Sequence, residues 1–373
     1  MSFDLELQKV DSRDPMPKYL QARGILIDAI RSGRLSPGTK LPSTKEISSL
    51  FDISLITAHR ALEGLVESGW LRREVGRGTY VRDDVDPAHQ AQRQLAIGLM
   101  LDACVNIDDF YHSTIITGLR REAHAERRRI EFFFHDGFDL RGKSKRDIGA
   151  ICIHPPIEAQ AQVERLARGH AVIILGGAFA GTRIPSVDCD NELGGRMAVR
   201  HLVGLGHRRL MVLSGPTNLS NARDRVRGAM LELAAHGIEL PDGDLPESKD
   251  SVLLDEETRA FVERRLLDPS GPTAVIAGGF YLALAVMQVA RGAGLRVPAD
   301  VSIVGFDDPP SAPLLDPPLT TVRQPLEEMA AQGCRLICQA LADRRGISES
   351  CVLPTELVVR SSTGPPRAVS SAP

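Results

Sequence analysis

The sequence predicts a multi-domain chain with a small α+β domain at the N-terminus and a larger α/β domain with parallel sheets behind it. Two observations lead to this fold class. Residues 1–82 contain three short helical patterns and two short strands, whereas apolar strands alternate with amphipathic helices from residue 95 onwards. The length of 373 residues also exceeds that of one usual domain, so more than one hydrophobic core is expected.

Composition favours a globular protein without a membrane segment. Hydrophobic residues make up 43% and charged residues 25% of the chain. The first residues, "MSFDLELQKVD", lack the apolar stretch of a signal peptide, and the longest apolar run, "AVIILGGAFAG", is too short to cross a bilayer. We therefore expect a cytoplasmic protein.

The six cysteines are scattered, with no CxxC pair and no histidine at metal-ligand spacing. We expect them to be reduced and mostly buried, and we expect neither a metal site nor a cofactor.

Charge is unevenly distributed along the chain. Residues 1–82 carry 4 Lys and 9 Arg against 10 acidic residues, a net charge of +3, which leaves −6 for the remainder of a chain whose total is −3. This asymmetry gives mild support to a DNA-binding N-terminus.

The N-terminal elements follow from periodicity and capping signals. Apolar residues at helical spacing predict a first helix over residues 17–32. Ser43 and Glu46 have the spacing of a capping box and predict a short second helix. Ser54 can cap a third helix that runs to about residue 68, where Gly69 follows.

Two short strands follow in "WLRREVGRGTYVRD" and flank the tripeptide Gly76-Arg77-Gly78, whose glycines permit a tight hairpin. Three helices and a two-stranded wing make a winged helix-turn-helix, which we assign to residues 1–82. Residues 83–94 are polar and lack periodicity, so they are expected to form a linker.

The segment "GRLSPGTKLPSTKEISSLFDISLITAHRALEGLVESGWLRREVGRGTYV" resembles the GntR family of bacterial transcription factors. The resemblance covers most of residues 17–81 and implies DNA binding through the third helix. The positions of Leu55 and His59 are commonly Arg in that family. This departure predicts an unusual DNA site, because aliphatic side chains pack on thymine methyl groups instead of donating hydrogen bonds.

On the third helix, the helical period places Ile56, His59 and Arg60 on the outer face, with Leu55 at its border. Hydroxyl groups, a lysine and a wing-tip arginine can hold phosphates or enter a minor groove. The candidate DNA-binding residues are Lys45, Ser54, Leu55, Ile56, Thr57, His59, Arg60, Gly76, Arg77 and Gly78. The alternative for the charged residues and His59 is a solvated surface position, and for Ser54 and Thr57 it is a cap and a core-edge residue.

Residues 95–365 are assigned to a two-lobed domain, because roughly residues 95–363 resemble the effector domain of the lac and galactose repressor family, which is similar to periplasmic sugar-binding proteins. The matching blocks are "SVDCDNELGGRMAVRHLVGLGHRRLMVLSGP", "RDRVRGAM", "VPADVSIVGFDD", "DPPLTTVRQP" and "LPTELVVRSST". The resemblance implies a periplasmic-binding-protein-like domain of two lobes joined by crossovers, with an effector in the cleft between them. It also implies a homodimer.

Within this domain the candidate effector-binding residues are Phe110, Tyr111, His154, Asp190, Asn191, Arg225, Phe280 and Asp307. Arg225 and Asp307 match ligand-binding positions of the family. A salt bridge across the cleft is the alternative for both. Phe110 and Tyr111 match an aromatic contact position, or they are core residues. His154 and the Asp190-Asn191 pair follow strands, at the edge where open α/β sheets bind ligands; for His154 a structural role is the alternative.

Two departures qualify the effector domain. Gly279 and Phe280 stand where the family commonly has Asn-Asp, a bidentate acceptor for sugar hydroxyls. An effector with fewer hydroxyls, an effector stacked on an aromatic ring, or no effector is therefore expected in place of a typical free hexose. Residues 137–147 are also too few for a full helical crossover, which makes the geometry of the dimer harder to infer. Residues 366–373 are expected to be a disordered tail.

Together these features predict a sequence-specific transcriptional regulator, most simply a repressor that binds a pseudo-palindromic operator as a dimer and responds to a small molecule. The alternative is a sugar-type substrate-binding protein without catalysis. GntR domains also occur fused to aminotransferase-like domains that use pyridoxal phosphate. However, the chain lacks a GxGxxG fingerprint, a Walker loop, a nucleophile elbow and an HExxH motif, so we expect no enzyme. Repression or activation and the direction of the ligand response stay open.

Overall fold

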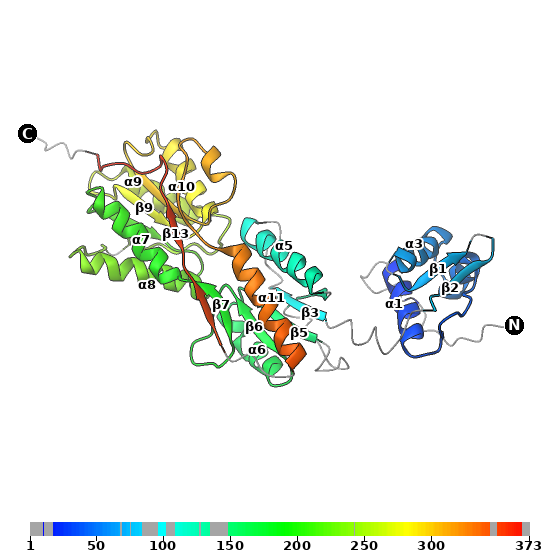
Figure 1. The fold of residues 1–373 in the computed structure, drawn as a ribbon. Coiled ribbons are helices and arrows are strands. Elements are labelled where there is room, and N and C mark those ends of the chain that lie inside the picture. Colours follow the sequence, from blue (N-terminus) through cyan, green and yellow to red (C-terminus); the bar gives the residue numbers. More distant parts are fainter. Residues whose placement is uncertain are drawn as a thin grey trace, which may run out of the picture. The chain divides into compact units, whose positions relative to one another are not determined.

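The computed structural model divides into two compact units, Met1–Leu95 and Ala96–Pro373, which are described separately (Figure 1). The residues that the structure describes are 10, 18–67, 69–74, 76–83, 96–101, 109–126, 128–134, 148–241, 243–343 and 349–367. Most of the predicted linker, Cys104, the short crossover at 137–147 and tail residues 368–373 lie outside them.

The first unit contains three helices and a two-stranded wing. Its elements are α1 (Lys18–Arg31), α2 (Thr44–Phe51), α3 (Leu55–Glu67), β1 (Leu71–Glu74) and β2 (Gly78–Val81). The strands are antiparallel, with Leu71 opposite Val81. The predicted winged helix-turn-helix is therefore confirmed.

Capping explains where the second helix begins. The Ser43 hydroxyl accepts a hydrogen bond from the Glu46 N–H at 3.3 Å, and the Glu46 carboxylate accepts one from the Ser43 N–H at 2.7 Å. This is the predicted capping box.

The inner face of α3 is buried as expected from its helical period. Its buried residues are Ala58, Ala61, Leu62 and Leu65, and they belong to one core with residues of α1 and α2.

The second unit begins with a lobe built on a fully parallel sheet of six strands, in the order β12-β7-β6-β5-β3-β4. The strands are β3 (Ala96–Leu101), β4 (Arg129–Phe134), β5 (Ile148–Ile153), β6 (Val172–Leu175), β7 (Ser186–Cys189) and β12 (Cys351–Leu353). Helices α5 (Phe110–Ala125) and α11 (Leu326–Asp343) pack on one face. Helix α6 (Gln160–Ala167), preceded by a 3-10 turn at Ile157–Ala159, packs on the other. We call this the N-lobe.

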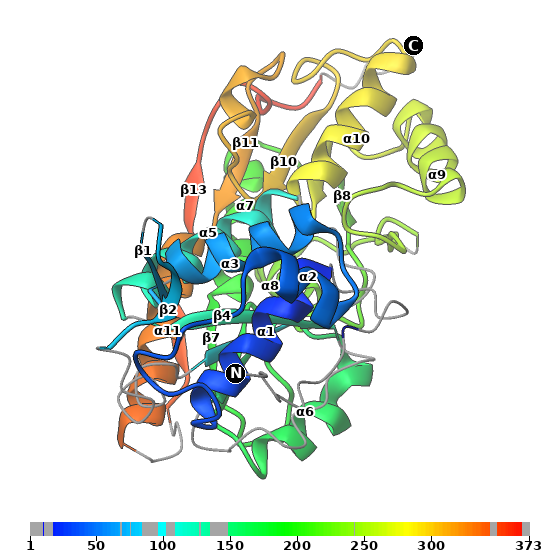
Figure 2. The same cartoon turned by 90° about the vertical axis from the view of Figure 1, so that its right-hand side faces the viewer.

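The other lobe, the C-lobe, contains a sheet of five strands in the order β13-β11-β10-β9-β8, parallel except for β13. The strands are β8 (Leu210–Leu213), β9 (Ala274–Ala277), β10 (Ser302–Phe306), β11 (Thr320–Arg323) and β13 (Glu356–Val358). Helices α7 (Asn191–Gly204) and α8 (Ser220–Ala235) cover one face, and α9 (Glu256–Leu267) and α10 (Phe280–Gly292) cover the other (Figure 2). A 3-10 turn, Ala312–Leu314, follows β10.

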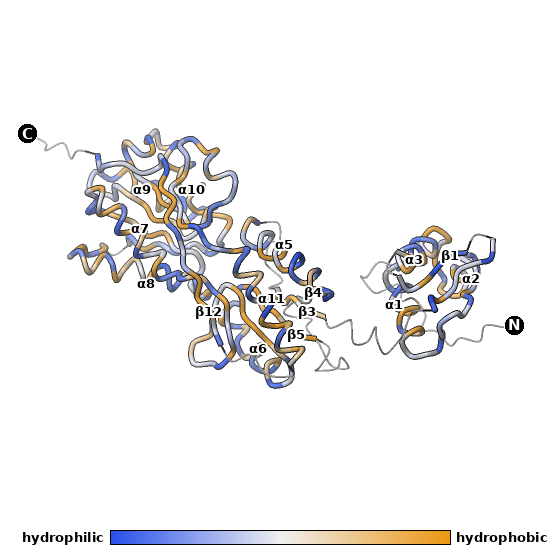
Figure 3. Tube along the Cα trace, viewed as in Figure 1, coloured by the Kyte–Doolittle hydropathy of each residue, from blue (hydrophilic) through white to orange (hydrophobic). Residues whose placement is uncertain are grey.

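The chain passes between the lobes three times: from β7 to α7, from β11 to α11, and from β12 to β13. The last passage joins two consecutive strands that belong to different sheets (Figure 1). Most of the strands are apolar and buried, as expected where helices cover both faces of a sheet (Figure 3). The predicted two-lobed α/β architecture with parallel sheets is confirmed.

Two further expectations concern the whole chain. Cys152, Cys189, Cys334, Cys338 and Cys351 are free thiols, and all but the last are buried. Among the residues that the structure describes, no helix is long and apolar enough to span a membrane.

Candidate functional site

Helix α3 exposes two aliphatic side chains where the sequence predicts its DNA-reading face. Leu55 is 55% exposed and Ile56 is 82% exposed, although large apolar side chains are normally covered. Both lie in the first turn of the helix, whose N-terminal residues contact base edges in helix-turn-helix proteins. This exposure is the property that a groove-reading face requires.

The polar candidates of α3 have local partners. The Ser54 hydroxyl accepts a hydrogen bond from the Thr57 N–H at 3.1 Å and also lies 2.7 Å from the Thr57 hydroxyl, so both residues serve as a helix cap. His59 Nδ1 lies 3.4 Å from the Glu63 carboxylate. The Arg60 guanidinium stacks on the Tyr19 ring at 4.1 Å from its centroid. Ser54, His59 and Arg60 are nevertheless exposed, so these contacts do not cover them.

The tip of the wing has the backbone geometry that its glycines were expected to provide. Gly76 has φ 74° and Gly78 has φ 127°, values that side chains disfavour. Between them the Arg77 side chain is 80% exposed. On α2, Lys45 is exposed as well. Lys45 and Arg77 are therefore both exposed to solvent, on separate elements, with Arg77 Nη1 4.0 Å from a carboxylate oxygen of Glu74.

A cavity of about 80 Å³ lies between the two lobes of the second unit. Six predicted residues line it: Phe110, Tyr111, His154, Arg225, Phe280 and Asp307. They come from the start of α5, the end of β5, helix α8, the start of α10 and the end of β10. The carboxyl ends of parallel strands and the N-termini of helices thus meet at one place, as expected for an α/β ligand site.

Two predicted residues are not part of the cavity wall. The Asp190 carboxylate accepts a hydrogen bond from the Leu193 N–H at 2.8 Å and caps helix α7. Asn191 is buried behind Arg225, whose Nε donates to the Asn191 amide oxygen at 2.8 Å, while Asn191 donates to Asp188 at 3.2 Å. Asp190 therefore begins the helix, and Asn191 orients the arginine.

Arg225 is only 7% exposed. It donates from Nη1 to the Gly278 carbonyl oxygen at 2.5 Å, and its guanidinium lies 4.5 Å from the centroid of the Phe306 ring. Among the described residues, no ion pair joins it to Asp307. These contacts hold a cation at the cavity without neutralising it directly, and a polar ligand can supply the missing partner.

Asp307 and His154 are the polar groups at the ends of β10 and β5. Burial raises the pKa of the Asp307 carboxyl, partly offset by the charge of Arg225 and by a hydrogen bond from Gln324. Burial lowers the pKa of His154 to about 4, so its ring is neutral at neutral pH. Both residues have positive φ, which is uncommon for side-chain-bearing residues and frequent at functional sites.

Sequence reasoning did not identify Asp109 and His112. His112 is 7% exposed and lines the cavity, and its Nδ1 lies 2.7 Å from Asp109 Oδ2. The other carboxylate oxygen, Oδ1, accepts the His112 N–H at 2.7 Å and caps α5. The spacing of three residues between an N-cap aspartate and a histidine was the available signal. Tyr281 was also missed; its hydroxyl accepts a hydrogen bond from the Phe110 N–H at 3.3 Å.

Within the part of the chain that the structure describes, three buried side-chain atoms at this cavity have no hydrogen-bond partner: Tyr111 Oη, His112 Nε2 and His154 Nε2. The three rings form one group, with centroid distances of 5.2 Å between Tyr111 and His112, 5.4 Å between Tyr111 and His154, and 6.1 Å between the two histidines. Buried polar atoms normally have partners, so this group indicates the place of a bound polar molecule.

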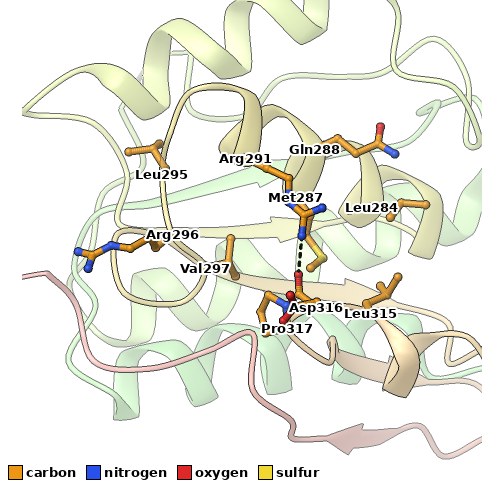
Figure 4. A pocket seen from close by; sticks show the side chains of 10 residues that line it. All are labelled: Leu284, Met287, Gln288, Arg291, Leu295, Arg296, Val297, Leu315, Asp316 and Pro317. Atoms are coloured by element: carbon orange, nitrogen blue, oxygen red, sulfur yellow. Dashed lines mark hydrogen bonds between the residues drawn. The ribbon is translucent and has the colours of Figure 1, made fainter.

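A larger cavity, about 430 Å³, lies in the C-lobe beside α10 (Figure 4). Its walls include Met287, Leu315 and Pro317, and Arg291 donates to the Asp316 carbonyl oxygen at 3.4 Å. None of its lining residues has a buried polar atom without a partner. Volume alone therefore does not identify the ligand site, and the smaller cavity has the stronger chemical evidence.

Among the described residues, no group of three or more His, Cys, Asp or Glu could hold a metal ion.

Comparisons with known proteins agree with this division of the chain. Residues 18–81 match the family model of bacterial regulatory proteins of the gntR family, and residues 199–363 match that of the periplasmic binding protein-like domain. The arabinose metabolism transcriptional repressor of Geobacillus stearothermophilus is 29% identical over 366 residues, which cover 93% of this chain and 98% of that protein. The HTH-type transcriptional regulator AglR of Rhizobium meliloti is 29% identical and covers 86% of this chain and 94% of that protein.

Solved structures show the same fold in the second unit. The lac repressor dimer bound to its operator and an anti-inducer has a TM-score of 0.65 at 23% identity, over 76% of this chain and 99% of that one. A complex of the transcriptional regulator CelR with cellobiose has a TM-score of 0.64 at 21% identity, over 86% of this chain and 100% of that one.

Fold, cavity and relatives together define the class of this protein: it is a DNA-binding transcriptional regulator. More particularly, its residues 18–81 are a helix-turn-helix domain that matches the gntR-family model, and residues 199–363 match the periplasmic binding protein-like domain.

Proposed function

We propose that the chain is a repressor that binds a pseudo-palindromic operator as a homodimer and is controlled by a small polar metabolite bound between its two lobes. The observation that carries the proposal is the interlobe cavity, where a guanidinium, a carboxylate and three unpartnered buried polar atoms meet. The metabolite is a sugar or a less hydroxylated relative of one. The cavity binds this molecule without transforming it.

The relatives support both parts of the proposal. The name of the Geobacillus protein places it in arabinose metabolism as a repressor, and the CelR structure contains cellobiose. The lac repressor structure is a dimer on its operator, and a two-fold protein matches a two-fold DNA site. A ligand that contacts both lobes changes DNA occupancy only by the difference between its affinities for the two conformations.

The proposal is tested by selecting bound fragments from the source genome and measuring their affinity by fluorescence anisotropy, with and without sugars. Arg225→Ala should keep operator affinity and lose the response to the sugar, because the cation at the cavity is removed. Arg227→Ala is the matched control on the same helix, since that arginine is 59% exposed and pairs with Glu192. If Arg225→Ala loses both properties, Arg225 has a folding role instead.

A protein that binds a sugar but no genomic DNA fragment would favour the second candidate function, a substrate-binding protein. The exposed Leu55 and Ile56 on α3, and the exposed Arg77 at the tip of the wing, favour DNA binding. Operator binding without any response to small molecules would support the regulator function and contradict control by an effector.

A further inference from the structure

The two ring nitrogens of His112 have different surroundings in the cavity wall. Nδ1 lies 2.7 Å from the Asp109 carboxylate, whereas Nε2 has no hydrogen-bond partner among the described residues. We propose that His112, oriented by Asp109, determines which ligands the cavity accepts, and that it does so as a hydrogen-bond acceptor for a ligand hydroxyl. This inference rests on the proposed effector function of the same cavity.

The direction of the hydrogen bond follows from the chemistry of Asp109. An ionised carboxylate has no proton to donate, so His112 Nδ1 carries the hydrogen of the 2.7 Å contact. We take the ring as neutral, so that the remaining nitrogen, Nε2, is bare and accepts. It is buried without a partner, and a buried acceptor without a donor is costly. A ligand that brings an O–H group removes this cost, whereas a ligand without a donor retains it.

Tyr111 and His154 restrict the ligand further. Burial, followed by the nearby charge of Asp188, raises the pKa of the Tyr111 hydroxyl well above its usual value, so it keeps its proton and donates. Burial leaves the His154 ring neutral, with a pKa of about 4. A carboxylate cannot donate to His112 Nε2, and an ammonium cannot accept from the Tyr111 hydroxyl. A hydroxyl group can do both, so these two atoms are complementary to a hydroxyl group of the ligand.

The position of His112 in the chain also connects it to closure of the lobes. It lies in the first turn of α5, and in that same turn the Phe110 N–H donates to the hydroxyl of Tyr281 in the C-lobe at 3.3 Å. A ligand that contacts His112 is therefore next to a hydrogen bond between the lobes. The contact between the ligand and His112 is therefore expected where the two lobes meet.

The first test is calorimetry of the full chain with L-arabinose, D-xylose, D-galactose and D-glucose, and with D-galacturonate and D-galactosamine as charged counterparts of galactose. At least one of these sugars should bind, because each carries hydroxyl groups that can donate to His112 Nε2. Binding of none of them would overturn the inference. Operator binding measured on the same protein shows separately whether the regulator function holds.

The second test is His112→Phe, which keeps a ring of similar size and removes the acceptor. Affinity for the sugar that binds should fall tenfold to a hundredfold, because sites built around a hydroxyl discriminate strongly. Operator affinity should not change. His124→Phe, an exposed position near the end of the same helix, is the control and should bind the sugar normally. A sugar affinity of His112→Phe equal to that of the control would overturn the inference.

The third test needs no substitution of His112. Imidazole ¹⁵N chemical shifts of the full chain report which ring nitrogen carries hydrogen, and we expect Nδ1 of His112 to be protonated and Nε2 bare. Asp109→Asn keeps a helix-capping side chain, but its amide can donate to Nδ1 and permits the opposite tautomer. This variant should therefore shift the tautomer and weaken sugar binding together. A bare Nδ1 in the unsubstituted protein would contradict the proposed role of Asp109.

Discussion

His154 and Asp307 hold matching positions in the two lobes. His154 directly follows β5 and has φ 49°, Asp307 directly follows β10 and has φ 65°, and both line the interlobe cavity. Left-handed backbone at residues with side chains costs about 1–2 kcal/mol each. The surrounding packing must compensate for this cost, and such strained positions tend to occur where function requires a particular side-chain placement.

Neighbouring carboxylates at the end of β10 should behave differently when changed. Asp307→Asn tolerates the left-handed backbone and removes the charge at the cavity, so ligand affinity should fall at least tenfold with little loss of stability. Asp308 is buried against Arg323 and Arg360, both at 2.7 Å, and Arg323 is half-exposed. Asp308→Asn should therefore lower the free energy of unfolding by roughly 2–3 kcal/mol. Calorimetric titration and urea denaturation of both variants check this division, and equal effects on binding would contradict it.

Close packing of α7 on α8 should make Gly228 sensitive to the smallest added side chain. A Cβ at this position would lie 2.0 Å from the Glu192 carbonyl oxygen, so Gly228→Ala must push the helices apart. The cost should be about 1–3 kcal/mol, and ligand affinity should fall because Arg225 lies on the displaced helix. Gly204→Ala, at an open position near the end of α7, is the matched control for thermal denaturation. Equal melting temperatures for the two variants would speak against this contact.

Lys45 and Arg77 should contribute to DNA binding through phosphate charge. Each Ala substitution should weaken binding to all DNA sequences alike and reduce the slope of log affinity against log salt by about 0.9. Lys249→Ala, at a lysine of the second unit whose side chain is 75% exposed, is the control. The measurement is an anisotropy titration at several salt concentrations. An unchanged slope for Lys45→Ala would show that Lys45 does not contact a phosphate.

The exposed aliphatics of α3 should act on sequence preference instead. Ile56→Ala should lower affinity for the selected operator by about 1–3 kcal/mol, as expected for loss of one base contact, and leave binding to random DNA unchanged. Competition between operator and random duplexes measures the ratio. A uniform loss on both duplexes would assign Ile56 to folding or to the backbone.

Two buried groups should give opposite pH dependences of stability. Burial raises the pKa of Asp188 to about 7, so between about pH 4 and 7 the folded state keeps a proton that the unfolded chain releases, and the free energy of unfolding falls as pH rises. The pKa of His154 is lowered to about 4, so the unfolded chain binds the extra proton below about pH 6.5, and stability falls as pH drops.

Asp188→Asn and His154→Asn should remove these dependences, each on the order of 3–4 kcal/mol across its window. Urea denaturation of both variants and the unsubstituted protein at pH 4.5, 6 and 8 checks the signs. A variant whose stability keeps the same pH slope as the unsubstituted protein would show that its group titrates normally.

Local signals in the sequence were enough for the elements and the fold class. Ser43, Glu46 and the glycines of the wing act on backbone groups a few residues away, so their effects do not depend on distant packing. Apolar periodicity likewise identified the buried face of α3 and indicated that strands alternate with helices in the second unit. Arg225 and Asp307 were placed at the cavity by resemblance to a known family, and the structure brings them to the same wall.

Only the tertiary structure decided what each polar side chain at the cavity contacts. Asp190 and Asn191 are adjacent in sequence, yet one caps α7 and the other supports Arg225, because a helix start directs consecutive side chains differently. The pairing of Asp109 with His112 is local, but the burial of the His112 ring beside Tyr111 and His154 at the interlobe cavity is set by the packing of α5 against other elements. Sequence periodicity can place a residue on a face of its helix, but which groups from the two lobes meet there is set by their packing.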